Sequence, residues 1–187
     1  MEYILLLTAC INPDGMPFTC LADVGVRKKQ YIEALNFYLK NTTRKIVFVE
    51  NSGTDISSSF KDFQHRIEFL CFDGNLCFDK RKGKGYGEAL ILEYAMAKSE
   101  FITDDVLIFK LTGRLQLINI NRLIHYMDKL SPSKNFVCVV PPQNNSVDSR
   151  CFVCNKYYLE NIFLKDKFHI DDSVAVSYTH LRAHETS

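Results

Sequence analysis

The sequence predicts an α/β domain in which helices flank a largely parallel central sheet. Short apolar runs alternate with longer segments that carry apolar residues at helical spacing. The apolar runs are continuous, as in strands that are buried on both faces of a parallel sheet. With 187 residues, of which 47% are hydrophobic and 24% charged, the chain has the length and composition of one domain with a sizeable core.

The first elements predict a βαβ unit. Residues 3–10 (YILLLTAC) form an apolar run that opens into an Asn-Pro-Asp-Gly loop, as expected of a buried strand. Residues 27–40 place aromatic and aliphatic side chains on one helical face. Residues 45–50 (KIVFVE) are rich in β-branched and aromatic residues and stop at an Asn-Ser-Gly turn, which indicates a second strand.

The alternation continues along the chain. The further expected elements are a short helix at about 58–64, strands at 66–72, 106–110 and 136–140, and helices at about 85–99 and 117–130. Asp-Gly-Asn, Ser-Pro and Pro-Pro turns separate several of them. We therefore expect a single Rossmann-like domain over residues 1–176.

The last residues do not continue this pattern. Residues 177–186 (SYTHLRAHET) resemble the translated read-through of a sequencing adapter, so we expect a foreign or disordered tail at 177–187. The native domain is then expected to lack its C-terminal part. His180 and His184 lie four residues apart, but zinc sites normally need a third protein ligand, so we expect no metal there.

Composition narrows the class of protein. The formal net charge of +1 gives no general attraction to nucleic acid, so no nucleic-acid partner is expected. No stretch is apolar enough to span a bilayer and no basic leader is present, which predicts a cytoplasmic protein. The seven cysteines lie mostly in apolar runs and fit a reducing compartment. Cys151 and Cys154 have C-x-x-C spacing without a second pair, which favours two packed thiols.

A basic, glycine-rich stretch precedes the helix expected at 85–99. Gly83, Gly85 and Gly87 allow backbone N–H groups to approach a ligand, and the helix would point its positive end at the same place. This arrangement suits a phosphate group. The alternative is a solvated basic loop, and neither a P-loop nor a dinucleotide-binding fingerprint is present.

Further candidates follow the expected strands. In open α/β sheets, ligands bind outside the carboxyl ends of the strands, near the point where the strand order reverses. Glu50 can accept hydrogen bonds from a ribose or a base, while Lys110 or Arg114 can hold a diphosphate. The set predicts a nucleotide site. The structural alternatives are a turn cap for Glu50, a surface ion pair for Arg114 and a hydroxyl bonded to the backbone for Thr8.

Four motifs occur in a fixed order: T-A-C at 8–10, E-N-S-G at 50–53, G-K-G-x-G-E-A at 83–89 and K-L-T-G-R at 110–114. This order resembles the nucleotide-sugar-binding half of GT-A-fold glycosyltransferases. It is closest to bacterial enzymes of surface-polysaccharide synthesis, which build capsules and lipopolysaccharide. The resemblance covers roughly residues 2–173 and depends mainly on the order of the motifs.

The resemblance implies a glycosyltransferase that moves a sugar from a nucleotide-sugar donor to a glycan or lipid-linked acceptor. It also allows peripheral association with the inner face of the membrane. It implies nucleotide-sugar contacts from Thr8, Ala9, Glu50, Asn51, Lys84, Gly85, Lys110 and Arg114. By the same resemblance, Thr8, Ala9 and Glu50 are expected to meet the nucleoside and Lys84 and Gly85 its diphosphate side. Lys110 and Arg114 are expected to meet the diphosphate or the donor sugar.

The sequence departs from the family at the fourth strand. The family commonly ends this strand with D-x-D, which holds a divalent metal, whereas Lys110-Leu111-Thr112 stands here and Asp104-Asp105 precedes the strand. A cation from Lys110 or Arg114 can neutralise the leaving diphosphate, so no metal cofactor is favoured. Asp148 is the best remaining carboxylate for catalysis or a donor contact, with a turn or helix cap as its alternative.

Two other functions stay open. One is a nucleotidyltransferase. Such enzymes normally have a glycine-rich turn after the first strand, whereas Gly15 is the only glycine in residues 11–17 of this sequence. A non-catalytic nucleotide- or protein-binding domain is the other, because neither D-x-D nor a convincing catalytic base is present.

Overall fold

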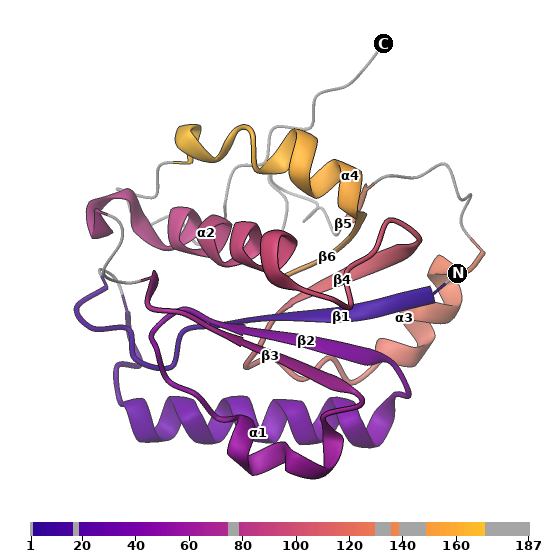
Figure 1. Cartoon of the computed structure of the whole chain (residues 1–187), viewed down its shortest axis with the longest axis horizontal. Helices are drawn as coiled ribbons and strands as arrows, with labels where there is room; N and C mark the ends of the chain where they lie inside the picture. The colour runs from indigo at the N-terminus through magenta and orange to yellow at the C-terminus, as the bar shows by residue number, and fades with distance from the viewer. Residues whose placement is uncertain (1, 17–18, 75–78, 130–135, 139–148, 171–187) are drawn as a thin grey trace.

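The computed structural model describes residues 2–16, 19–74, 79–129, 136–138 and 149–170. These residues form a six-stranded sheet in the order β3-β2-β1-β4-β6-β5, with helices on both faces (Figure 1). The strands are β1 Glu2–Ala9, β2 Lys45–Glu50, β3 Ile67–Cys71, β4 Val106–Thr112, β5 Phe136–Cys138 and β6 Cys151–Asn155. The pairs β1–β2, β2–β3 and β1–β4 are parallel, so the predicted α/β fold with a largely parallel sheet is confirmed.

Strand β6 was not predicted from the sequence. It pairs antiparallel with both β4 and β5. Side chains alternate between the two faces of a strand, so Cys151 packs on the core beneath α1 and Cys154 in the core beneath α2. Burial raises the pKa of the Cys154 thiol well above its usual value. The two thiols are therefore packed separately and do not form a shared site.

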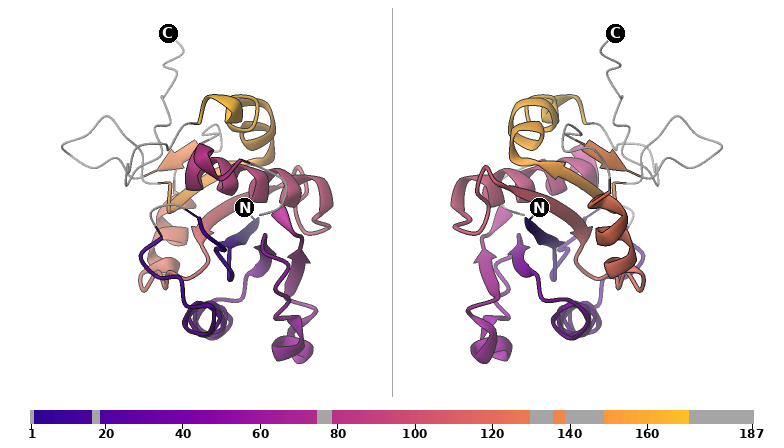
Figure 2. Two further views of the ribbon diagram at one scale, coloured as in Figure 1. Left: turned by 90° about the vertical axis from the view of Figure 1, so that its left-hand side faces the viewer. Right: turned by 90° about the vertical axis from the view of Figure 1, so that its right-hand side faces the viewer.

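The longer helices are α1 Val24–Asn41, α2 Gly83–Lys98 and α3 Ile120–Met127. The short helical segments are η1 Ser57–Phe63, η3 Lys80–Lys82, α4 Lys156–Tyr158, η4 Leu159–Phe163 and η5 Lys167–His169. Helix α1 begins at Asp23, whose carboxylate accepts a hydrogen bond from the backbone N–H of Val26 at 2.7 Å. Figure 2 shows α1 and η1 on one side of the sheet, and α2 with the C-terminal helical segments on the other.

The two faces of the sheet explain the continuous apolar runs. In β1, Leu5 and Leu7 point into the core beneath α1, while Ile4 and Leu6 point into the core beneath α2. All four side chains are fully buried. Burial of a leucine or isoleucine stabilises a fold by roughly 1.5–3 kcal/mol, so a strand between two helical layers needs apolar residues on both faces.

None of the helices in the described ranges combines the length and the apolar character that crossing a bilayer requires.

Candidate functional site

The parallel strands bring the predicted site residues to one edge of the sheet. Ala9 lies opposite Glu50, and Thr8 lies opposite Thr112, two residues beyond Lys110. Thr8, Glu50 and Lys110, which follow or end strands in the sequence, therefore lie near the same carboxyl edge of the sheet. From β1 the chain proceeds to β2 and β3 on one side, and β4 then pairs with the other side of β1. The strand order thus reverses between β1 and β4, which is where open α/β sheets bind ligands.

Buried polar side chains are concentrated at this edge. In the described part of the chain they are Thr8, Arg27, Thr42, Glu50, Asn51 and Lys110. All except Thr42 lie at the carboxyl ends of the strands or contact the loops that follow them. A polar group taken out of water must be hydrogen-bonded or paired, so each of these side chains needs a specific partner.

Glu50 joins the loop after β1 to the loop after β2. Its carboxylate accepts hydrogen bonds from the backbone N–H groups of Ile11 at 2.8 Å, Ser52 at 2.9 Å and Thr54 at 2.9 Å, and from the Ser52 hydroxyl. Burial and the nearby Glu50 carboxylate raise the pKa of Cys71 to about 11. These contacts are those of the turn-capping alternative. A direct contact from Glu50 to a nucleoside stays a prediction.

Asn51 and Arg114 each hold a buried polar atom that has no hydrogen-bond partner in the described part of the chain. The backbone N–H of Asn51 donates to Ala9 at 3.1 Å, but its buried Oδ1 has no hydrogen-bond partner among the described residues. The same holds for Nε of Arg114 and the Thr19 hydroxyl, both in loops at this edge. Nε of Arg66, at the opposite end of the sheet, likewise has no partner among the described residues. An unmade buried hydrogen bond costs about 1–3 kcal/mol, which water or a ligand can offset.

Lys110 is fully buried on the α2 side of β4. Its Nζ donates to Oε1 of Glu88 at 2.5 Å and to the backbone carbonyl of Ser149 at 2.5 Å. The Thr8 hydroxyl donates to the same oxygen of Glu88 at 3.0 Å. Glu88 belongs to the sequence motif that opens α2, but no role was assigned to it from the sequence. The structure therefore adds Glu88 to the site and connects β1, β4 and α2 through one carboxylate.

The α1 side of the same edge carries two guanidinium groups. Arg27 donates from Nε to the carbonyl of Cys10 at 2.9 Å and from Nη1 to that of Leu21 at 3.1 Å, which folds the loop after β1 onto α1. Arg114 donates from Nη1 to Oε1 of Gln30 at 3.2 Å. The Arg27 guanidinium therefore hydrogen-bonds to backbone carbonyls, whereas Nε of Arg114 has no hydrogen-bond partner among the described residues.

Tyr31 lies between these two arginines and the end of β1. Its hydroxyl accepts a hydrogen bond from the backbone N–H of Cys10 at 3.0 Å. Burial raises the pKa of the Tyr31 phenol, while the Cys10 amide, Arg27 and Arg114 act in the opposite direction. Both guanidinium groups therefore lie near the Tyr31 phenol.

The close packing of β4 against β1 accounts for the glycine in the K-L-T-G-R motif, Gly113. Its N–H donates to the carbonyl of Thr8 at 2.9 Å. A Cβ at this position would lie 2.8 Å from the Thr8 carbonyl oxygen and 3.2 Å from the Tyr31 ring. Only glycine allows the end of β4 to approach the end of β1 this closely.

The glycine-rich stretch forms the first turns of α2. Gly83 has a φ of +83°, and the helix starts there, slightly before the expected residue. Gly85 is buried and Lys84 is exposed. The ammonium of Lys82 lies 4.4 Å from the centre of the Tyr86 ring, and Lys80 contacts Asp14, which joins this turn to the loop after β1.

The carboxylates that were considered for a metal are separated. Asp148 lies outside the described residues, as does the segment 171–187. Asp104 precedes β4 and pairs with Lys156 at 3.5 Å, away from the carboxyl edge. Within the described ranges, no group of three or more His, Cys, Asp or Glu side chains is placed to hold a metal ion.

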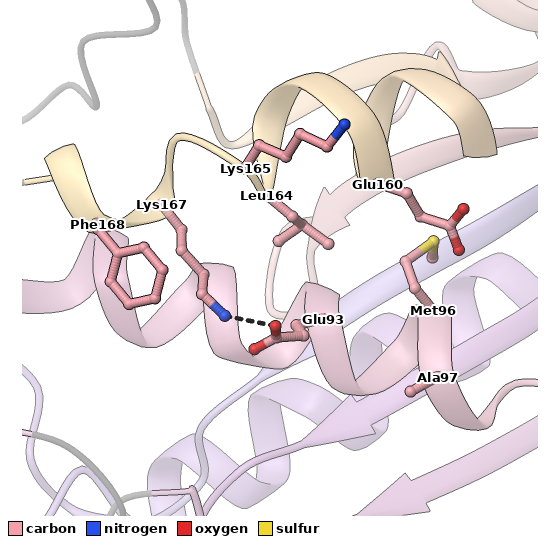
Figure 3. Close-up of a pocket in the computed structure, with 8 residues that line it drawn as sticks. All are labelled: Glu93, Met96, Ala97, Glu160, Leu164, Lys165, Lys167 and Phe168. Carbon is pink, nitrogen blue, oxygen red and sulfur yellow. Dashed lines mark hydrogen bonds and ion pairs between the residues drawn. The ribbon is translucent and has the colours of Figure 1, made fainter.

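A surface hollow of about 540 Å³ lies elsewhere, between α2 and the segment from η4 to η5 (Figure 3). Met96, Ala97 and Leu164 supply apolar surface, and an ion pair joins Lys167 to Glu93 across it. None of the residues predicted from the sequence lines this hollow. The candidate site is therefore the carboxyl edge of the sheet.

No protein-family model matches the chain, and no curated protein matches it significantly. Function is therefore inferred from the geometry of the carboxyl edge.

Proposed function

We propose that this protein is a glycosyltransferase that binds a nucleotide-sugar donor at the carboxyl edge and transfers the sugar to a glycan or lipid-linked acceptor. One observation carries the proposal: buried charged and polar side chains meet where the strand order reverses between β1 and β4. An α/β sheet concentrates ligands at this place. The order of the sequence motifs, which resembles that of GT-A-fold enzymes, directs the proposal from nucleotides in general to nucleotide sugars.

Arg114 is the best candidate for the diphosphate. A guanidinium presents several N–H donors in a planar fork that matches phosphate oxygens. Arg114 uses Nη1 for Gln30, and its buried Nε has no partner among the described residues. Lys110 is held by Glu88 and Ser149, so it supplies positive charge beneath the edge.

Asn51 is the best candidate for the nucleoside among the residues after β2. Its Oδ1, which has no partner among the residues that the structure describes, can accept a hydrogen bond from a base N–H or a ribose hydroxyl. Glu50 holds the loops on either side in place through its backbone contacts. Thr8 and Ala9 end the neighbouring strand, so the same ligand can reach them.

Charge neutralisation without a metal is part of the proposal. Where the GT-A-fold enzymes that the sequence resembles commonly carry D-x-D, β4 ends in Lys110-Leu111-Thr112. In this arrangement Arg114 and Lys110 stabilise the charge that develops on the leaving nucleoside diphosphate.

The direct test is binding of nucleoside diphosphates and nucleotide sugars, first by a thermal-shift screen and then by calorimetry in a chelator. We expect at least one nucleoside diphosphate to bind and to remain bound in the chelator. Arg114→Ala should weaken that binding by about 1.5–3 kcal/mol, and Arg114→Lys should restore it only in part. Arg122→Ala, which changes an exposed arginine of α3, is the matched control.

Two results would contradict the proposal. Loss of binding in the chelator would indicate that a metal ion takes part in holding the diphosphate. Equal binding by Arg114→Ala and the parent protein would remove Arg114 from the site.

A non-catalytic nucleotide-binding domain is the second candidate. It is favoured by the observation that Glu50 and Glu88 both accept hydrogen bonds from protein donors, so neither is placed as an obvious base. Release of free nucleoside diphosphate from a bound nucleotide sugar distinguishes the two functions. The transferase releases it in the presence of an acceptor, and the binding domain does not.

A further inference from the structure

The ion pair between Lys110 and Glu88 is asymmetric. The Lys110 side chain is 0% exposed, whereas the Glu88 side chain is 23% exposed. Removing an ammonium from water costs several kcal/mol unless a well-placed counter-charge offsets it. Glu88 provides that charge at 2.5 Å, yet it remains partly open to solvent beside the ends of β1 and β4.

The two oxygens of the Glu88 carboxylate have different surroundings. Oε1 accepts hydrogen bonds from Nζ of Lys110 at 2.5 Å and from the Thr8 hydroxyl at 3.0 Å. Oε2 accepts none from the residues that the structure describes. Two donors from different strands fix the orientation of the carboxylate, and its second oxygen bonds to no donor in the described part of the chain.

A purely structural counter-charge does not require this arrangement. Buried ion pairs can often be replaced by apolar residues of similar volume without loss of stability, so stability alone does not account for this one. An ionised carboxylate only accepts hydrogen bonds and repels phosphate oxygens. Among the parts of a nucleotide sugar, its natural partners are the neutral hydroxyl groups.

We infer that Glu88 binds a hydroxyl group of the ligand through Oε2, on the ribose or on the donor sugar. This inference rests on the proposed function, because it requires a polyhydroxylated ligand at the carboxyl edge. Lys110 and Thr8 are positioning residues that hold the carboxylate in place. The sugar-bearing part of the ligand then lies against the second turn of α2.

The test uses Glu88→Gln in the full chain, together with Lys110→Met and the double variant Glu88→Gln/Lys110→Met. The single Glu88 variant leaves a buried ammonium without its counter-charge, whereas the double variant removes both charges and should recover thermal stability. Lys110→Met keeps the carboxylate. It should weaken binding of all nucleotides but retain any preference for a hydroxyl group.

Two ligand comparisons identify which hydroxyl is bound. The first compares UDP and GDP with their 2′-deoxy analogues, which tests the ribose. The second compares each nucleoside diphosphate with its nucleotide sugars, which tests the donor sugar. In the parent protein we expect a preference of about tenfold or more in one comparison, the size of a hydrogen bond to a charged group. Both variants that contain Glu88→Gln should reduce this preference several-fold, because a neutral amide forms a weaker hydrogen bond to a hydroxyl group than a carboxylate does.

The results separate the inference from the proposed function. Unchanged preferences in Glu88→Gln and the double variant, or an equal loss for every ligand, would show that Glu88 acts only as a counter-charge. Nucleotide binding would then still stand. Failure of the parent protein to bind any of these nucleotides would remove the proposed function and the inference together.

Discussion

Polar side chains at the two ends of the sheet have different kinds of hydrogen-bond partner. At the amino end, the Thr42 hydroxyl donates to the carbonyl of Tyr38 at 2.9 Å, within one helical turn. Arg66 donates to the carbonyls of Leu39, Thr42 and Arg44 at 3.1, 2.8 and 3.2 Å. These contacts satisfy backbone groups at the end of α1 and in the loop that follows.

At the carboxyl end, side chains far apart in the chain meet each other. Lys110 of β4 and Thr8 of β1 both donate a hydrogen bond to one oxygen of Glu88. The carboxylate of Glu50 accepts hydrogen bonds from backbone N–H groups of two loops. At the amino end these side chains mainly complete backbone hydrogen bonding, whereas at the carboxyl end buried charged side chains join separate strands and loops. We therefore expect the stability of this protein to be most sensitive to replacement of polar side chains at the carboxyl end, where a ligand is expected.

The strongest test of this comparison is Glu50→Leu. The change leaves the backbone N–H groups of Ile11, Ser52 and Thr54 without their acceptor, so we expect a loss of about 4–5 kcal/mol in the free energy of unfolding. Thr42→Val at the amino end should cost only about 1 kcal/mol. Urea unfolding measures both. Equal losses would break the comparison.

The second test separates the two partners of the buried ion pair. Glu88→Leu leaves the ammonium of Lys110 buried and uncompensated, so a loss of about 3 kcal/mol is expected. Lys110→Met should cost about 1 kcal/mol, because the partly exposed carboxylate of Glu88 can be hydrated. The same urea titrations apply. If Lys110→Met proved as damaging as Glu88→Leu, the carboxylate would not be open to solvent.

A third test concerns the close approach of β4 to β1. In Gly113→Ala the new methyl group would meet the Thr8 carbonyl oxygen at 2.8 Å, and relief of this overlap should cost about 2 kcal/mol. Gly25→Ala in the first turn of α1 meets only the Asp23 side chain at 3.3 Å and should change stability by less than about 0.5 kcal/mol. The melting temperatures of the two variants report the difference. A neutral Gly113→Ala would show that the strand ends can separate freely.

The smallest effect is expected for the exposed pair of Arg81 and Asp79 in η3. The Arg81 side chain and backbone N–H lower the pKa of Asp79 to about 2. Stabilisation from this pair is therefore present above the ordinary pKa of Asp and disappears as the pH falls through about 2. Because the pair is exposed, Arg81→Ala should leave the melting temperature unchanged, while the pKa of Asp79 rises toward its usual value in an NMR titration. A clear drop in melting temperature would mean that surface pairs at this end also carry stability.

Much of the fold was predictable because its signals are local. Strands between two helical layers need apolar residues on both faces, so β1, β2 and β4 appear in the sequence as continuous apolar runs. The shared edge of Thr8, Glu50 and Lys110 follows from their positions near the carboxyl ends of parallel strands. Strand β6 was missed because its five residues carry little local signal and it is ordered by pairing with β4 and β5.

The partners of the charged residues depended on the tertiary structure. Lys110 and Arg114 were equal candidates for a diphosphate in the sequence, but packing buries Lys110 against Glu88 and leaves Nε of Arg114 unpartnered among the described residues. Glu88 stands 22 residues from Lys110 and 80 from Thr8 along the chain. Hydrophobic periodicity acts over neighbouring residues and determines which segments become strands and helices. The meeting of distant charges depends on how those segments pack, and only the folded chain decides it.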